Sequence, residues 1–180
     1  MAKEYSAKRR KDLETCMEVL WVEVKLDQAT KLFVGIVYMP KSTLAVLDQL
    51  ELSLDNTVAQ CKPRDNILVF GDFNCRDMHW CMSTDREGVA ELENKHEVST
   101  VSGRLIDITD SCALTQHNTH PTCNGSQLDL VFSTDLKMQI EVTEKATNST
   151  HGALEARISI NHSPEKCIPV PRIVHNYKKN

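Results

Sequence analysis

A carboxylate and an amide follow the most continuous apolar stretch of this chain. Residues 67–70 read Ile-Leu-Val-Phe and lead into Gly71, Asp72, Phe73 and Asn74. A short apolar run bounded by polar residues predicts a buried strand, and side chains two apart on an extended segment point the same way. Asp72 and Asn74 can therefore serve one site, with oxygen atoms suited to a divalent cation or a polarised water. A strand followed by a plain Asp-Asn turn fits this stretch alone equally well.

Three further polar side chains end or follow predicted strands. Tyr38 ends an apolar run, and Asp129 alternates with Leu128 and Leu130, so it faces away from them. His151 follows two small polar residues, Ser149 and Thr150. Each residue also has an ordinary structural interpretation, as a rim tyrosine, an edge-strand charge and a loop histidine.

The order of these motifs resembles that of the endonuclease/exonuclease/phosphatase superfamily, which has the deoxyribonuclease I-like fold. The resemblance covers about residues 20–160, and the stretch from Gly71 to Trp80 is most similar to non-LTR retrotransposon endonucleases. The matching motifs are Gly-Asp-Phe-Asn at 71–74, Tyr-x-Pro at 38–40, Ser-x-hydrophobic-Asp at 126–129, and Ser-Thr-His at 149–151 in place of Ser-Asp-His.

The resemblance implies a fold, a reaction and a substrate. The fold is an α/β four-layer sandwich of two packed, mostly antiparallel sheets with outer helices, here incomplete at the N-terminus. The reaction is metal-dependent phosphodiester hydrolysis with Mg²⁺ or Mn²⁺, which neutralises phosphate charge and activates water. The expected partner is nucleic acid, with DNA favoured over RNA, and Trp80 supports this choice over a phosphatase. The sequence gives no indication of a protein partner.

The resemblance also implies roles for individual residues. Asp72 would orient the attacking water, and Asp72 and Asn74 would hold the metal. Asp129 would orient His151, which would donate to the phosphate oxygens. The expected substrate contacts are Tyr38, Asn74, Thr122 and His151.

Two departures from the family pattern predict impaired activity. Thr150 stands where the family has an aspartate, so one negative charge is missing beside the metal. No strand before Leu20 supplies the family's Asn and Glu, and we interpret Glu14 as a chance match. The alternative function is therefore a non-catalytic remnant of the fold that serves as a binding module.

A zinc module is a third hypothesis. Several cysteines and histidines are near one another in sequence, but no pair has the spacing of a zinc knuckle. They are Cys75, His79, Cys81, His117, His120 and Cys123.

Composition favours an ordinary globular domain. The chain has 180 residues and a formal charge of −4, so nucleic-acid contact would require a local basic patch or metal ions. The absence of a long apolar run predicts an intracellular protein, in the nucleus or cytoplasm, and the seven scattered cysteines predict reduced thiols. We expect a basic segment at 1–19, one domain at 20–160, and a linker or tail at 161–180.

Hydrophobic periodicity predicts alternating strands and helices. Strands at 20–26 and 32–38 should pair as a hairpin, and a helix capped by Ser42 or Thr43 should follow. Residues 75–100 read as a long loop. The remaining predictions are a helix at 103–114 and strands at 127–132, 138–142 and 154–160.

Overall fold

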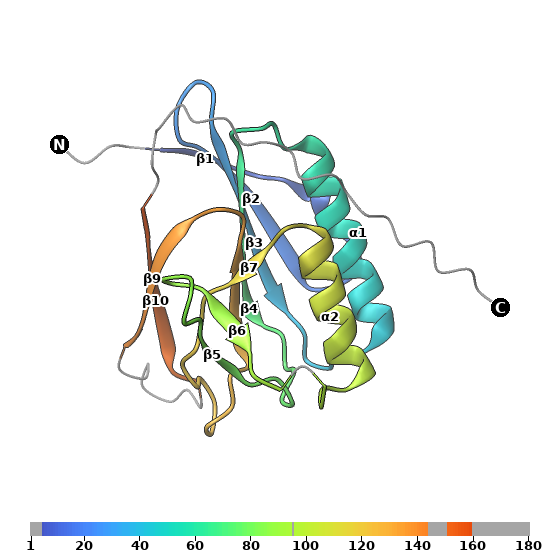
Figure 1. The fold of residues 1–180 in the computed structure, drawn as a ribbon. Coiled ribbons are helices and arrows are strands. Elements are labelled where there is room, and N and C mark those ends of the chain that lie inside the picture. The colour runs from blue at the N-terminus through green and yellow to red at the C-terminus, as the bar shows by residue number, and fades with distance from the viewer. Residues whose placement is uncertain (1–4, 95, 144–150, 160–180) are drawn as a thin grey trace.

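A six-stranded mixed sheet organises the protein. The computed structural model describes residues 5–94, 96–143 and 151–159 (Figure 1). Strands β3 (Lys31–Tyr38) and β4 (Asn66–Asp72) pair in parallel, and every other neighbouring pair in this sheet is antiparallel. The hairpin predicted for residues 20–26 and 32–38 is confirmed. In spatial order the strands are β1 (Ser6–Arg9), β2 (Val19–Lys25), β3 (Lys31–Tyr38), β4 (Asn66–Asp72), β8 (Asp129–Ser133) and β7 (Thr115–Gln116).

Two helices lie side by side on one face of this sheet (Figure 1). Helix α1 (Leu44–Gln60) begins where predicted, and the Thr43 hydroxyl caps it by accepting the Val46 amide at 3.3 Å. Its residues Leu47, Leu50 and Leu54 are buried against the sheet, as the apolar spacing predicts. Helix α2 (Thr100–Ser111) begins slightly before the predicted start because the Ser99 hydroxyl caps it. A single 3₁₀ turn, η1 (Lys11–Leu13), precedes β2.

The opposite face of the sheet carries a second, smaller core. Strands β9 (Lys137–Thr143) and β10 (Ala153–Ser159) form an antiparallel pair that packs there. Alternation along β4 sends Ile67 and Val69 into the helix-covered core and Leu68 and Phe70 toward β9 and β10. The central strand is therefore buried on both faces, which explains its unbroken apolar run.

The predicted sandwich is present in part. Among the described residues, the second sheet consists only of β9 and β10, and the described helices cover one face of the main sheet. Strands β2 and β3 have a partly exposed apolar strip on the face of the main sheet that β9 and β10 cover only in part. In this strip the Ile36 side chain is 42% exposed. Leu20, Val22 and Val34 are half-buried beside it.

The stretch from 75 to 100 is not the long loop that its mixed composition indicates. It contains a small antiparallel hairpin of β5 (Trp80–Met82) and β6 (Ala90–Leu92). These strands are too short to show alternation, so sequence periodicity does not reveal them.

The N-terminal residues that the structure describes pack against the domain. Strand β1 extends the main sheet beside β2, and Leu13 is fully buried in the helix-covered core. The described part of the predicted basic segment is therefore continuous with the domain rather than separate from it. The predicted tail at 161–180 lies outside the described residues.

No helix in the described ranges is long and apolar enough to cross a membrane. No disulfide joins the six cysteines whose positions are described.

Candidate active site

Three neighbouring strands bring Tyr38, Asp72 and Asp129 into one row. Tyr38 of β3 is the Cα partner of Asp72 in β4, and Asp72 is in turn the Cα partner of Asp129 in β8. Alternation sends all three side chains to the face that carries β9 and β10, because Phe70 and Val131 lie on that face two residues away. Strand register therefore brings Tyr38, Asp72 and Asp129 side by side.

Asp72 is held in a partly buried and electrostatically unfavourable position. The Asn74 amide donates to Asp72 Oδ1 at 2.9 Å, and the Met39 amide donates to the Asp72 carbonyl at 2.8 Å. Burial raises the pKa of Asp72, and the charge of Asp129 raises it further, whereas His151 and Arg76 act in the opposite direction. A carboxylate whose pKa is raised by burial and by a neighbouring carboxylate is a common property of functional sites.

Gly71 allows β4 to run into this site. Its φ is +145°, and a Cβ at this position would lie only 1.8 Å from the Val37 carbonyl oxygen. No other residue fits here without moving β3 away from β4. The glycine of the Gly-Asp-Phe-Asn motif is therefore required by strand packing.

Asp129 and His151 form a hydrogen-bonded pair. Asp129 Oδ2 lies 2.8 Å from His151 Nδ1, and the two side chains are 23% and 31% exposed. An ionised carboxylate can only accept a hydrogen bond, so in this pair His151 Nδ1 carries the hydrogen and donates it to Asp129. Ser149 and Thr150, which precede this histidine, lie outside the described residues.

Thr122 holds the backbone around both members of the pair through hydrogen bonds. Its hydroxyl accepts the Asp129 amide at 3.1 Å, and its carbonyl accepts the Gly152 amide at 2.7 Å. Because Thr122 is only 3% exposed, its hydroxyl suits a positioning role better than the substrate contact predicted for it.

Sequence reasoning missed a second supporting residue, Asn118. Its side chain is fully buried and donates to the Asp129 carbonyl at 2.7 Å and to the His120 carbonyl at 3.1 Å. Its oxygen accepts the His120 amide at 2.9 Å. A buried amide that makes several bonds fixes a loop. The signal available in the sequence is only an asparagine in a turn-rich stretch.

Tyr38 and Asn74 lie at the rim of the row. Tyr38 is 49% exposed, which leaves its ring accessible to a ligand. Asn74 has a φ of 51°, and its side-chain nitrogen donates to the Pro40 carbonyl at 3.0 Å. Asn74 therefore ties the end of β4 to the end of β3, in addition to the metal or substrate role predicted for it.

The donor set suits a divalent cation only in part. In the described ranges, no group of three or more His, Cys, Asp and Glu side chains is arranged to hold a metal ion. However, Mg²⁺ commonly takes one or two carboxylates and fills its remaining positions with water and phosphate oxygens. Asp72 with Asn74 fits that pattern, and the repulsion between Asp72 and Asp129 would favour a cation.

Two residues of the zinc hypothesis, Cys75 and His117, are engaged in other contacts. The Cys75 thiol contacts the Phe73 carbonyl and the Ser42 hydroxyl, at 3.4 and 3.7 Å. The His117 ring lies between the Gly88 carbonyl and the Ser133 hydroxyl, at 2.6 and 2.8 Å. These contacts give no support to a zinc site.

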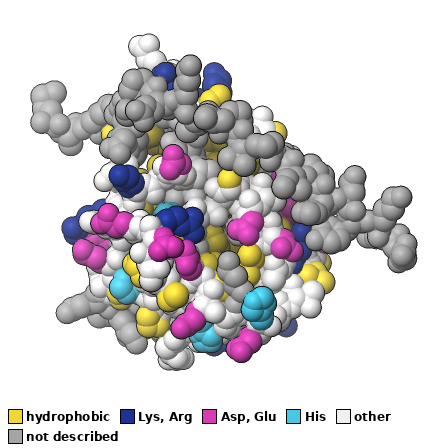
Figure 2. Space-filling view, viewed as in Figure 1, with side chains coloured by type: hydrophobic (Ala, Val, Ile, Leu, Met, Phe, Trp, Pro, Cys, Tyr) yellow, Lys and Arg dark blue, Asp and Glu magenta, His cyan; other side chains and the backbone are white. Residues whose placement is uncertain are grey.

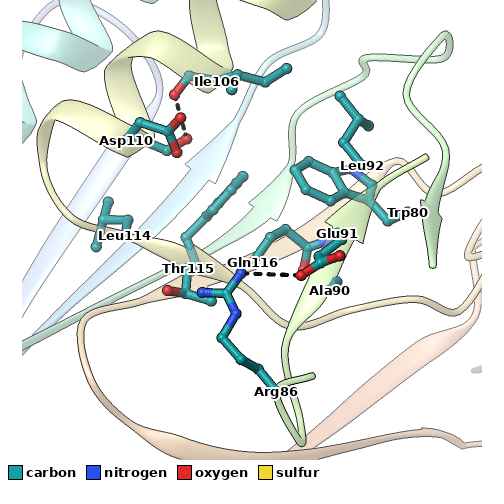
Figure 3. A pocket seen from close by; sticks show the side chains of 12 residues that line it. Trp80, Arg86, Ala90, Glu91, Leu92, Ile106, Asp110, Leu114, Thr115 and Gln116 are labelled. Carbon is teal, nitrogen blue, oxygen red and sulfur yellow. Dashed lines mark hydrogen bonds and ion pairs between the residues drawn. The ribbon is translucent and has the colours of Figure 1, made fainter. Parts of the chain in front are cut away.

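A cavity of about 130 Å³ lies between α2, β7 and the β5–β6 hairpin (Figure 3). Trp80 lines it and packs edge-on against Phe132, and the indole nitrogen is buried without a described partner. None of the predicted catalytic residues lines this cavity. Trp80 therefore lines a cavity that is separate from the candidate active site. This cavity is on the helix-covered side of the sheet, where Trp80 packs next to Phe132.

A sequence profile described as endonuclease-reverse transcriptase matches residues 32–155, which span every strand that carries a site residue. The chain belongs to this family, within the endonuclease/exonuclease/phosphatase superfamily. The match begins in β3 and ends in β10, so it includes Tyr38, Asp72, Asp129 and His151. No curated protein matches the chain.

Three solved structures are similar to the chain over most of its length. A functionally unknown conserved protein from Enterococcus faecalis is 14% identical, with a TM-score of 0.48, over 89% of this chain and 67% of that protein. An endonuclease/exonuclease/phosphatase family protein from Bacteroides thetaiotaomicron is 12% identical, with a TM-score of 0.48, over 89% and 66%. A beta toxin from Staphylococcus aureus is 7% identical, with a TM-score of 0.41, over 78% and 57%. The chain thus spans about two thirds or less of the length of each.

Proposed function

We propose that this protein is a slow, metal-dependent phosphodiesterase that cleaves nucleic acid, with DNA as its substrate. Family membership supports the reaction class. The observation that carries the proposal is the row of Tyr38, Asp72 and Asp129 on adjacent strands, with His151 bonded to Asp129 at 2.8 Å. In the proposed reaction these side chains, which lie at one end of the sheet, orient the water and contact the phosphate.

Each side chain has a defined task in this proposal. Asp129 accepts from His151 Nδ1 and so orients the ring, and in its protonated imidazolium form the ring donates from Nε2 to a phosphate oxygen as negative charge develops there. Asp72 orients the attacking water, and its raised pKa makes its carboxylate a better proton acceptor than an exposed aspartate. Tyr38 contacts the phosphate from the rim. A divalent cation held by Asp72 and Asn74 would neutralise phosphate charge and acidify bound water.

The reaction is expected to be slow because the described site has few acidic groups. Asp72 and Asp129 stand alone in the row, and Asp129 is engaged with His151. Occupancy by Mg²⁺ depends strongly on the number of carboxylates, so it should be low at cellular concentrations.

Nicking of supercoiled plasmid tests this proposal. We expect slow conversion to the open circle with Mg²⁺ or Mn²⁺, none with a chelator, and a rate about a hundredfold or more lower for His151→Ala. His96→Ala is the matched control, because His96 is exposed and lies outside the site. Nicking that persists in chelator, or that continues in His151→Ala at close to the wild-type rate, would overturn the proposal.

A second candidate function is a non-catalytic nucleic-acid-binding domain. It is favoured by the lack of a described group of three metal-ligating side chains. Calorimetric titration separates the two functions. Binding of Mg²⁺ or Mn²⁺ in the millimolar range or tighter, abolished by Asp72→Asn, supports the enzyme. No binding up to that range, together with no nicking, supports the binding domain.

A further inference from the structure

Two exposed cations flank the end of β4. Lys41 follows the Tyr-x-Pro segment after β3, and Arg76 follows the Gly-Asp-Phe-Asn segment after β4. Neither side chain forms a hydrogen bond or an ion pair with any described residue. In contrast, five other described arginines form ion pairs, namely Arg9, Arg10, Arg86, Arg104 and Arg157.

Hydrogen bonds join the two segments that carry these cations. The Asn74 side chain donates to the Pro40 carbonyl at 3.0 Å, and the Ser42 hydroxyl donates to the Phe73 carbonyl at 2.6 Å. Lys41 lies between Pro40 and Ser42, so its backbone is fixed on both sides to the loop that follows Asp72.

Arg76 is mounted with similar rigidity. Cys75 before it is buried, and its thiol contacts the Ser42 hydroxyl at 3.7 Å. Asp77 after it accepts the Ser99 amide at 2.5 Å and the Ser102 hydroxyl at 2.6 Å, which anchors the turn to the start of α2. An exposed guanidinium on an anchored loop loses little backbone entropy when it binds a ligand.

The net charge of the chain gives this pair its importance. The chain has a net charge of −4, and on the face in Figure 2 the described acidic and basic side chains are interspersed. A polyanion therefore requires a local cationic contact. Arg76 also acts electrostatically on Asp72, where it opposes the increase in pKa caused by burial and by Asp129.

We propose that Lys41 and Arg76 form a two-point clamp for the phosphate backbone of a nucleic-acid strand, on either side of the scissile bond. The clamp rests on the proposed function, because it positions the strand over Asp72 and His151. Phosphate contacts of this kind set position and orientation and carry no base preference.

Binding to labelled duplex DNA in chelator, over a series of salt concentrations, tests the clamp without catalysis. Each phosphate contact contributes about 0.9 to the slope of log affinity against log salt. Lys41→Ala and Arg76→Ala should each lower that slope by about 1 and weaken binding about two- to fivefold, equally for unrelated sequences. The double variant should lower the slope by about 2.

Lys62→Ala and Arg64→Ala are the matched controls. Both residues are exposed, form no described side-chain bond or ion pair, and precede β4 at the opposite end of that strand. We expect the control double variant to keep the wild-type slope, and thermal melts should show that all variants fold.

Three results overturn the clamp: an unchanged slope in the Lys41 and Arg76 variants, an equal decrease in the controls, or no binding by the wild type. A clamp-dependent slope without any nicking would instead leave the clamp standing and refute the proposed catalysis. Nicking with an unchanged slope would refute only the clamp.

Discussion

Asp129 and His151 are 22 residues apart in sequence, yet Asp129 Oδ2 lies 2.8 Å from His151 Nδ1. Strand β8 supplies the carboxylate at its first residue, and the histidine stands just before β10 and bridges to Cys123. Thr122 forms hydrogen bonds on both sides of the pair, because its hydroxyl accepts the Asp129 amide and its carbonyl accepts the Gly152 amide. The pair is therefore built by long-range contacts, and it links the main sheet to the β9–β10 pair.

Replacing Asp129 with asparagine tests the orienting role of this carboxylate. Asp129→Asn keeps the shape but no longer fixes the ring nitrogen that carries the hydrogen. We expect the nicking rate to fall about a hundredfold or more, as for the loss of a positioned acid-base group. Asp107→Asn, on the exposed face of α2, should have no effect. A rate within threefold of wild type in Asp129→Asn would show that His151 does not depend on Asp129.

Asp72→Asn should increase stability while it removes activity. The folded-state pKa of Asp72 lies above its usual 3.8, so stability falls as pH rises through the interval between these two values. The amide removes this cost at neutral pH, and the advantage should vanish below about pH 3.8, where the carboxyl is protonated in both states. Denaturant unfolding at pH 7 and at low pH measures the difference. Lower stability of Asp72→Asn at pH 7 would contradict the electrostatic account of this position.

Gly71→Ala should destabilise the protein severely, by about 3 kcal/mol or more, because its Cβ would overlap the Val37 carbonyl. Gly103→Ala is the matched control, since nothing lies within 4 Å of a Cβ at that position in α2. The control should gain about 0.5–1 kcal/mol from helix propensity. Chemical denaturation gives both values, and a loss below about 1 kcal/mol for Gly71→Ala would show that β3 and β4 can separate at little cost.

The buried His117 should make stability depend on pH. Burial lowers its pKa below the usual 6.5, and the hydrogen bond between its ring and the Gly88 carbonyl opposes this decrease only in part. A lowered folded-state pKa means that stability is fully present above pH 6.5 and decreases as pH falls below it. Unfolding free energies between pH 7.5 and about 5 should show this decrease, and His117→Gln should reduce it. An identical pH profile in His117→Gln would refute this role, and His96→Ala serves as the exposed control.

Several elements are predictable from sequence because local signals and tertiary packing agree. Strands β3 and β4 follow unbroken apolar runs, and α1 has a capping threonine and a leucine stripe. Strand β1 gives no such signal, since all four of its residues are exposed at the sheet edge. Its place depends on pairing with β2, which no local pattern encodes.

The candidate site residues also differ in whether the sequence alone identifies them. Asp72 and Asp129 are identifiable because each stands at the end of a strongly patterned strand. Asn118 is not identifiable, because its role requires the fold to bring residues 118–122 against β8. Thr122 is identifiable as a site residue, but only the structure shows that its hydroxyl bonds to the Asp129 amide.

The central claim is that Asp72 and the Asp129–His151 pair act on one phosphate. A double-mutant cycle on plasmid nicking in Mg²⁺ tests it most directly, with wild type, Asp72→Asn, His151→Ala and the double variant. Residues that act as one unit have strongly non-additive effects. We predict that each single variant loses about a hundredfold or more and that the double variant is at most a few-fold slower than the slower single one. Losses that multiply in the double variant, or a wild type that does not nick at all, would contradict the account.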